Sequence, residues 1–129
     1  MVRVVPEDQL LHHIRLDEDA VADVERGFAE LDAGNATVPP IMMIPVPHLE
    51  AEVDIKSAYI KGLPYLAVKV ASGFFKNPER GLPSQSGQML VIDAETGFLV
   101  AVLLDNGYLT QVRTGAAGAV AARYLAPKN

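Results

Sequence analysis

A single arginine stands near the start of the last apolar segment of the chain, where it could contact a ligand. The stretch from Asn106 to Leu125 is otherwise small and apolar, and its spacing predicts a helix. On a helical period Thr110, Arg113 and Thr114 share one face. The first N–H groups of a helix are unpaired and the dipole is positive there, so an adjacent arginine suits a carboxylate or phosphate. The alternative is a solvated surface arginine that pairs with a nearby acid.

A lysine lies within the short segment Ala67–Ala71, whose other members are small and apolar. An ammonium group in such a strand either extends to water or binds an anionic partner. Both interpretations of Lys69 remain open, because one face of a strand is often exposed. Together with Arg113, Lys69 would form a pair of cations above small side chains. Such a pair would bind the carboxylate of an amino acid or a keto acid.

Two further segments carry polar side chains whose role the residues alone do not settle. Lys56 alternates with Asp54 and Glu52 along one strand, and the simplest interpretation is a solvated face of mixed charge. The Ser72–Gly87 loop offers hydroxyl and amide donors that could face the mouth of a site. These donors are Ser84, Gln85 and Ser86. Loops of this composition often serve only to connect two strands.

The sequence does not support several other kinds of chemistry. The adjacent His12 and His13 would point about 100° apart on a helix, which is unsuited to chelation. No cluster of histidine, aspartate or glutamate has metal-ligand spacing, so we expect no metal site. No catalytic serine arrangement is present. Gly115 and Gly118 lie inside the predicted last helix, which indicates close helix packing rather than a dinucleotide-binding loop.

The first third of the chain predicts a strand followed by two helices. Met1–Val5 has the pattern of a short strand, and Pro6 suits the first turn of a helix that extends to about His13. Asp17 has the features of an N-cap, and apolar residues recur at helical spacing over about Asp17–Ala33. We expect this second helix to serve in packing.

The rest of the chain predicts strands and a final helix. Three segments rich in β-branched and apolar residues are Val38–Ile44, Val53–Ile60 and Leu66–Ala71. Prolines restrict the first of these to an edge or irregular position. Met89–Asp93 and Phe98–Leu104 predict a β-hairpin, and about Leu109–Leu125 predicts the last helix. This order indicates an α+β fold, in which helices flank a mixed sheet.

Length and composition limit the possible partners. The 129 residues suit a single domain, residues 1–129, with one core. A net charge of −5 and the lack of a long basic run argue against nucleic acid. The apolar runs are shorter than the roughly 20 residues of a membrane span, and the amino terminus does not resemble a signal peptide. The chain has no cysteine, as expected for a protein of the reducing cytoplasm.

Four motifs in the second half of the chain occur together in a known pattern. They are Asn77-Pro…Gly81-Leu-Pro-Ser, Asp93-Ala-Glu-Thr-Gly97, Leu104-Asp-Asn-Gly-Tyr-Leu-Thr110 and Arg113-Thr-Gly-Ala-Ala. They resemble the amino-terminal half of the ornithine cyclodeaminase/mu-crystallin family. Two earlier segments, Pro39-Pro-Ile-Met and Glu52-Val-Asp-Ile-Lys-Ser-Ala-Tyr59, are similar to its ectoine-utilisation branch. The resemblance covers nearly all 129 residues, and Leu-Thr-x-x-Arg-Thr-x-Ala is its most specific motif.

The resemblance implies an amino-terminal domain that dimerises and forms one wall of a substrate cleft. In the family a Rossmann domain that binds NAD(P) follows it. Cyclodeaminases of the family oxidise an amino acid by hydride transfer to NAD⁺, close a ring with loss of ammonia and return the hydride. Relatives reduce imino acids or oxidise other amino acids. By motif, Lys69 and Arg113 would hold the substrate carboxylate, while Ser84, Arg113 and Thr114 would contact the cofactor.

The chain departs from the family pattern at two positions and in length. An arginine that also grips the carboxylate usually follows the proline pair, whereas Ile41-Met-Met43 has no cation. Lys56 takes the place of an acidic residue that lies near the substrate amine in ornithine cyclodeaminase. Lys56 would therefore contact the substrate and repel the side-chain ammonium of ornithine, while a substrate with a second acidic or acylated end stays open. The chain stops about where the Rossmann domain should begin, so we expect no catalytic residue in it.

Two hypotheses of different classes follow from these observations. The first is the substrate-binding and dimerisation domain of an NAD-dependent, cyclodeaminase-like enzyme acting on an amino acid, inactive by itself and without tightly bound cofactor. The second is a free-standing, non-catalytic, dimeric module that binds a small molecule. Both imply a homodimer, and a downstream strand followed by Gly-x-Gly-x-x-Gly would favour the enzyme.

Overall fold

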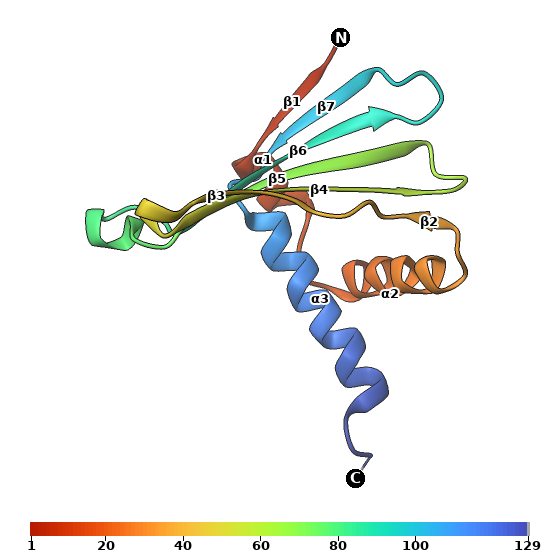
Figure 1. Cartoon of the computed structure of the whole chain (residues 1–129). Coiled ribbons are helices and arrows are strands. Elements are labelled where there is room, and N and C mark those ends of the chain that lie inside the picture. Colours follow the sequence, from red (N-terminus) through yellow and green to blue (C-terminus); the bar gives the residue numbers. More distant parts are fainter. Residues whose placement is uncertain (129) are drawn as a thin grey trace.

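The computed structural model describes residues 1–128, and it consists of one mixed sheet with helices beneath it (Figure 1). In chain order the elements are β1 (Arg3–Pro6), α1 (Glu7–His13), α2 (Glu18–Asp32), β2 (Ala36–Thr37), β3 (Met42–Val46), the 3-10 turn η1 (Pro47–Leu49), β4 (Ala51–Ile60), β5 (Tyr65–Phe74), the 3-10 turn η2 (Asn77–Arg80), β6 (Gln85–Asp93), β7 (Leu99–Leu104) and α3 (Tyr108–Leu125). This arrangement confirms the predicted α+β class, a mixed sheet with flanking helices.

The centre of the sheet is an antiparallel meander of β4, β5, β6 and β7. The strand order is β1-β7-β6-β5-β4-β2, and β3 also pairs with β4. The sheet is mixed because β1 runs parallel to β7. The short β2 and β3 share one side of β4, the side away from β5. The proline-rich segment therefore lies at the edge, as predicted, since Pro45 has no N–H to donate to a further strand.

Two predicted boundaries were wrong. The edge strand is Met42–Val46 rather than Val38–Ile44, because the adjacent prolines Pro39 and Pro40 cannot donate ladder hydrogen bonds. The predicted loop Ser72–Gly87 is much shorter, because β5 continues to Phe74 and β6 begins at Gln85. Small and polar residues continue these strands because the ladder is formed by backbone groups and does not depend on side-chain type.

Helix α2 begins at the predicted cap and packs against α3. The Asp17 carboxylate accepts a hydrogen bond from the Ala20 N–H at 2.9 Å, which satisfies a donor of the first turn. Val21 forms a small buried core with Ala116 and Val120 of α3. The predicted packing role of this helix is thus confirmed.

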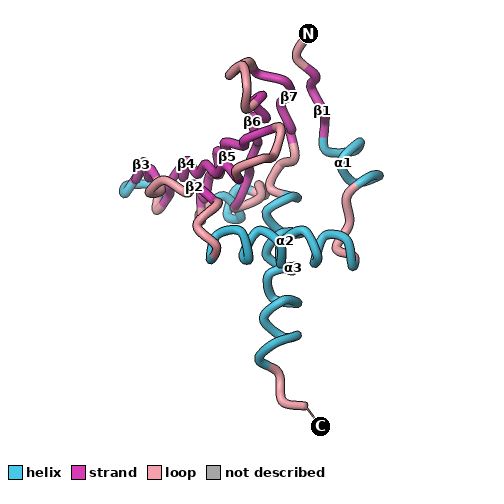
Figure 2. Tube along the Cα trace, turned by 90° about the vertical axis from the view of Figure 1, so that its right-hand side faces the viewer, coloured by secondary structure: helices cyan, strands magenta, loops and turns pink. Residues whose placement is uncertain are grey.

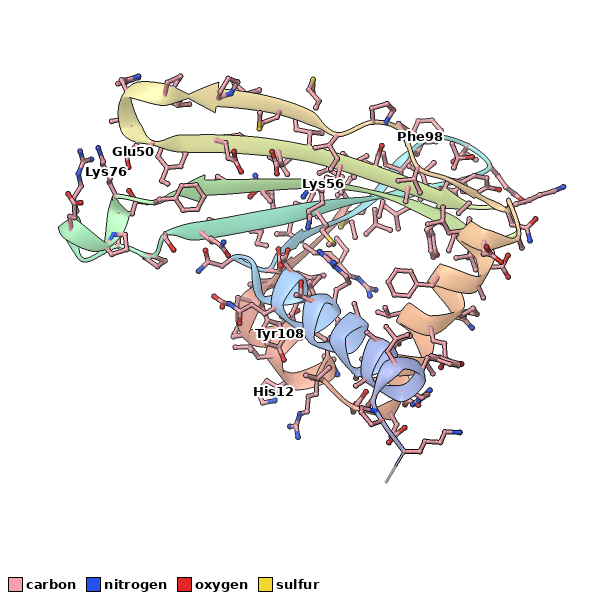
Figure 3. All side chains as sticks on the ribbon, turned by 60° about the horizontal axis from the view of Figure 1, so that its bottom comes forward. His12, Glu50, Lys56, Lys76, Phe98 and Tyr108 are labelled. Carbon is pink, nitrogen blue, oxygen red and sulfur yellow. The ribbon has the colours of Figure 1, made fainter. Side chains whose placement is uncertain are left out.

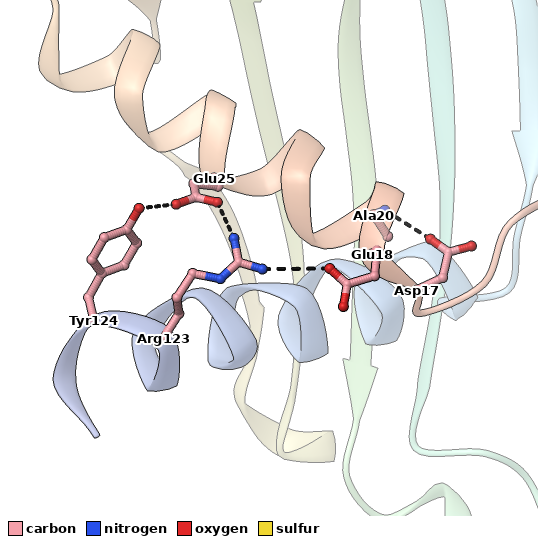
Figure 4. Close-up of polar contacts among 6 residues, drawn as sticks. All are labelled: Asp17, Glu18, Ala20, Glu25, Arg123 and Tyr124. Atoms are coloured by element: carbon pink, nitrogen blue, oxygen red, sulfur yellow. Dashed lines mark hydrogen bonds and ion pairs between the residues drawn. The ribbon is translucent and has the colours of Figure 1, made fainter. Parts of the chain in front are cut away.

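Polar contacts join the two helices where they cross (Figure 4). Arg123 Nη1 lies 2.5 Å from Glu25 Oε2, and Arg123 Nη2 lies 3.8 Å from Glu18 Oε2. The Tyr124 hydroxyl donates to Glu25, which raises the pKa of Tyr124 because the neutral phenol is the donor. These groups are solvent-accessible, so we attribute most of the cohesion of the helix pair to its apolar contacts.

The predicted close packing of two glycines in α3 is found at one of them. A Cβ added at Gly115 would lie 2.7 Å from Leu16 Cδ2, so the segment before α2 approaches the backbone of α3 there. Gly118 faces open space instead. The close approach draws the segment before α2 against the first half of α3.

Helices α2 and α3 lie on the same side of the sheet, and within residues 1–128 no helix covers the other side (Figures 1 and 2). The residues that face the uncovered side by strand alternation are largely apolar. They include Val4, Met42, Ile44, Ile55, Val68 and Leu90. The chain exposes 9133 Å², whereas a compact monomer of 13.9 kDa would expose roughly 6,700 Å². The chain therefore exposes more surface than a compact monomer of its mass.

Candidate functional site

A polar cavity of about 150 Å³ lies between the sheet and the first turns of α3. Charged side chains from two strands and one helix line it. They are Glu52, Asp54 and Lys56 of β4, Lys69 of β5 and Arg113 of α3. The fold thus brings together the three side chains that the sequence singled out for substrate binding, Lys56, Lys69 and Arg113.

Lys56 and Lys69 face each other directly across β4 and β5. The Lys56 ammonium lies 3.4 Å from Asp54 Oδ2, and these side chains are only 38% and 21% exposed. The β4 face does carry mixed charge and leaves Lys56 partly accessible, but the same residues also line the cavity, so the interpretation as a solvated strip was incomplete. Alternate residues of β4 face α3, because the meander turns this side of the sheet toward the helices.

Lys69 connects the sheet to the helix. Its Nζ donates a hydrogen bond to Thr110 Oγ1 at 3.2 Å. Burial, followed by the nearby charges of Lys56 and Arg113, lowers the pKa of Lys69 below that of an ordinary lysine. The acids Asp105 and Asp54 oppose this shift only in part. An anion in the cavity would relieve the repulsion among the three cations.

The start of α3 is capped from within the chain. The Leu109 N–H donates to Asp105 Oδ2 at 2.8 Å, and the Tyr108 N–H donates to the Asp105 carbonyl at 2.9 Å. Asp105 is 1% exposed, and its Oδ1 has no hydrogen-bond partner in the described part of the chain. The expectation that the first N–H groups of the helix are free for a ligand was therefore wrong in part. Arg113 lies one turn further along the helix.

The sequence reasoning missed Asp105, although a signal for it was present. An aspartate just before a glycine and a helical segment is typical of a helix start. The Gly107 backbone has a φ of +88°, which turns the chain so that the Asp105 carboxylate reaches the first turn. Asp105 therefore orients the helix that carries Thr110 and Arg113.

We expect Asp105→Ala to lower the free energy of unfolding by about 1–2 kcal/mol, because a buried cap of the helix is lost. Chemical denaturation of both proteins measures the difference. Asp105→Asn is the matched variant, since its side-chain carbonyl oxygen can still accept from the Leu109 N–H. Its free energy of unfolding should therefore fall less than that of Asp105→Ala. Equal stability of wild type and Asp105→Ala would contradict a capping role.

The predicted loop donors divide into two groups. Gln85 and Ser86 line the cavity, and the Ser86 hydroxyl donates to Asn106 Oδ1 at 3.0 Å, which ties β6 to the segment before α3. Ser84 does not line the cavity, and its carbonyl accepts from the Phe74 N–H at 2.8 Å. Thr114 is exposed on α3 beside Arg113 and also lies outside the cavity lining.

An apolar groove of about 440 Å³ opens beside the same cations, between α2 and the sheet. It shares Lys56, Lys69, Thr110 and Arg113 with the polar cavity. Its apolar lining includes Phe28, Leu31, Val38, Ala67 and Met89. A ligand held by the cations therefore has polar surroundings on one side and apolar surroundings on the other.

Two other types of site have no support in residues 1–128. No three histidine, aspartate or glutamate side chains of this range are grouped so that they could hold a metal ion. No helix of this range is both long and apolar enough to cross a membrane.

The family model described as the ornithine cyclodeaminase/mu-crystallin family matches residues 3–129. The chain belongs to this family. An uncharacterised cyclodeaminase of Sinorhizobium fredii is 47% identical over 129 residues, which are 99% of this chain and 39% of that protein. The chain therefore spans well under half the length of this ornithine cyclodeaminase/mu-crystallin relative.

Two solved structures of enzymes share the fold of this family member. The Δ1-pyrroline-2-carboxylate reductase of Thermococcus litoralis, in complex with NADH and L-proline, has a TM-score of 0.92 and 34% identity over 98% of this chain and 39% of its own. An archaeal alanine dehydrogenase dimer with bound NAD has a TM-score of 0.89 and 32% identity over 99% of this chain and 38% of its own. Both are cofactor-dependent enzymes of amino or imino acids.

Proposed function

We propose that residues 1–129 form the amino-terminal, substrate-binding and dimerisation domain of an NAD(P)-dependent, cyclodeaminase-like enzyme that acts on an amino acid. The observation that carries this proposal is the convergence of Lys69 and Arg113 on one cavity. A flexible ammonium and a planar guanidinium on opposite walls suit the two oxygens of a carboxylate. The reductase with bound L-proline supports the same class of ligand.

Within this proposal each wall of the cavity has a task. Lys69 and Arg113 hold the substrate carboxylate, and Thr110 keeps the Lys69 ammonium directed at it through their hydrogen bond. Glu52 and Asp54 lie on the same wall as Lys56 and would accept hydrogen bonds from the α-ammonium. The α-carboxylate and the α-ammonium would then be held at two separate points, which would orient the α-carbon between them. This orientation is the main requirement for a later hydride transfer from the α-carbon.

Of the residues proposed for the cofactor, Arg113 lines the cavity, while Thr114 and Ser84 lie outside its lining. Arg113 and Thr114 are adjacent on the exposed face of α3, and a guanidinium with a hydroxyl suits a phosphate or ribose. Arg113, Thr114 and Ser84 would therefore hold the nearer part of NAD(P). When bound, a nicotinamide cofactor supplies a hydride acceptor or donor. The chain's own contribution is to bind the amino acid and present its α-carbon.

The uncovered face of the sheet supports the dimer. Its apolar residues need a partner surface of similar character, and a second copy presents the same face. The alanine dehydrogenase, similar over 99% of this chain, is a dimer. We further propose that the protein belongs to the ectoine-utilisation branch, from its Pro39 and Glu52 motifs, and that it works in the cytoplasm, with which a chain without cysteine is compatible.

Carboxylate binding should weaken at alkaline pH, at values below the ordinary pKa of lysine. The ammonium form of Lys69 is the binding form, and its pKa is lowered by burial, Lys56 and Arg113. Between the lowered pKa of Lys69 in the folded chain and its ordinary pKa in the unfolded chain, the unfolded chain binds more protons. The contribution of Lys69 to the free energy of unfolding therefore rises with pH in this range. Calorimetric titration with L-alanine across this range measures the first effect. Lys69→Arg should retain affinity to higher pH, and a flat profile in wild type would contradict the role of Lys69.

Turnover by the complete protein tests the proposed enzyme. We expect one of two outcomes. A cyclodeaminase releases ammonia from an amino acid in the presence of NAD⁺ with no net change in the cofactor, whereas a dehydrogenase or reductase gives net reduction of NAD(P)⁺ with an amino acid or net oxidation of NAD(P)H with an imino acid. Arg113→Ala should abolish most of this activity, whereas Arg123→Ala, on the same helix but outside the cavity, should retain it. If amino acids bind without any cofactor-dependent turnover, the free-standing binding module is the correct function.

A further inference from the structure

The cavity holds one cation more than a single carboxylate requires. Lys69 and Arg113 together provide enough donors for both oxygens of one carboxylate. Lys56 lies directly opposite Lys69 in the ladder and lines both the polar cavity and the apolar groove. In Figure 3 the Lys56 side chain lies beneath the sheet, on the side that faces the helices. Its ammonium therefore shares the space that the substrate side chain would occupy.

This placement of Lys56 is unfavourable for the fold by itself. Like charges directly opposite one another on neighbouring strands are destabilising, and here both are partly buried. Asp54 compensates Lys56 only loosely, since the two charged groups lie 3.4 Å apart with the lysine over one-third exposed. A second anionic group from a ligand would complete the compensation.

The balance of charge along the cavity wall leads to the same conclusion. Three cationic and two acidic side chains line the cavity, and the acidic pair is suited to the α-ammonium. A zwitterionic amino acid has no net charge and leaves one cation uncompensated. An amino acid with a second carboxylate matches the lining. Asp105 also acts on Lys69 through its charge, but it lies outside the cavity lining, and its carboxylate accepts from the Leu109 N–H of the helix start rather than from a ligand.

We propose that Lys56 is a specificity-determining residue that binds a second acidic group, so that the substrates are dicarboxylic amino acids or the corresponding imino acids. This inference rests on the proposed function, because it assumes that Lys69 and Arg113 hold the α-carboxylate. It excludes diamino acids, whose second ammonium would meet Lys56 at close range. Because ring closure needs that second amine, the reaction on dicarboxylic substrates is oxidation of the amino acid or reduction of the imino acid at the α-carbon, without cyclisation. The specificity lies on β4 rather than on α3.

Binding of matched amino acids to the 129-residue chain tests the inference by isothermal titration calorimetry. L-Aspartate and L-asparagine have nearly the same size and differ by one charge. We expect wild type to bind L-aspartate at least about tenfold more tightly, as for one charge-assisted hydrogen bond. Lys56→Gln should remove this preference and leave L-asparagine affinity within about twofold. Lys56→Glu should reverse it, so that L-ornithine binds more tightly than L-aspartate.

Lys76→Gln is the matched control, since Lys76 pairs with Glu50 at the far end of the sheet (Figure 3). Circular dichroism of each variant confirms that it is folded. Equal affinity of wild type for L-aspartate and L-asparagine overturns the inference and leaves the proposed function standing. If Lys56→Gln weakens the binding of L-aspartate and of L-asparagine equally, the inference is also overturned, because Lys56 would then hold the α-carboxylate that both ligands share. If no amino acid binds wild type, the titration is repeated with the complete protein, and absence of binding there means that the proposed function fails and the inference fails with it.

Discussion

Replacement of Val68 by aspartate should convert a dimer of this chain into a monomer. Val68 lies near the middle of the uncovered face, where its neighbours across the strands are Leu90 and Ser57. A symmetric dimer would bury two unpaired carboxylates, each at a cost of about 3 kcal/mol or more. The dissociation constant of the dimer should therefore rise by at least about a thousandfold.

Light scattering at several concentrations measures this change. Ala119→Asp is the matched control, since it adds the same charge at an exposed position of α3 and should leave the dimer intact. Val68→Thr keeps the shape of the side chain without a charge, and it should weaken the dimer less. A wild-type chain that scatters as a clean monomer at high concentration would contradict the proposed second copy.

Arg113→Ala should raise KM for the amino-acid substrate of the complete protein at least tenfold. The lost charge-assisted hydrogen bond is worth roughly 1.5–3 kcal/mol, which corresponds to a factor of about 10 to 150. The comparison with Arg123→Ala separates this effect from loss of helix charge, because Arg123 contacts Glu25 and Glu18 instead of the cavity.

A combined variant extends the test. The double variant Lys69→Ala/Arg113→Ala should lose only slightly more substrate-binding free energy than the weaker-binding of the two single variants. The losses are not additive, because both cations act on one carboxylate. An unchanged KM for Arg113→Ala would remove this arginine from carboxylate binding. Fully additive losses would mean that the two cations contact different groups of the substrate.

Some of the fold was predictable because neighbouring residues form it. The predicted hairpin between β6 and β7 is confirmed, since Asp93 accepts from the Glu95 and Thr96 N–H groups and Gly97 takes a positive φ of +75°. These bonds hold the pKa of Asp93 below its usual range, chiefly through the Thr96 N–H. The cap of α2 at Asp17 is similarly local.

The composition of the site was less predictable because it depends on register. The place of Lys56 in the cavity could not be predicted from the strand pattern alone, because its pairing with Lys69 is set by the turn that joins β4 to β5, several residues away from either lysine. The sequence could show which residues alternate along β4, but not which face meets α3. The polar cavity and the apolar groove also need α2 and α3 on the same side, which is a property of the whole chain.

The alternation along β4 has an evolutionary consequence. Glu52, Asp54 and Lys56 line the polar cavity, while their neighbours Val53 and Ile55 belong to the opposite, apolar surface. In the proposed dimeric enzyme, exchange of charges at every second position would therefore change which metabolites are accepted without altering the subunit interface. Substrate preference and subunit contact would thus evolve separately on the two faces of one strand, and a new preference would need very few codon changes.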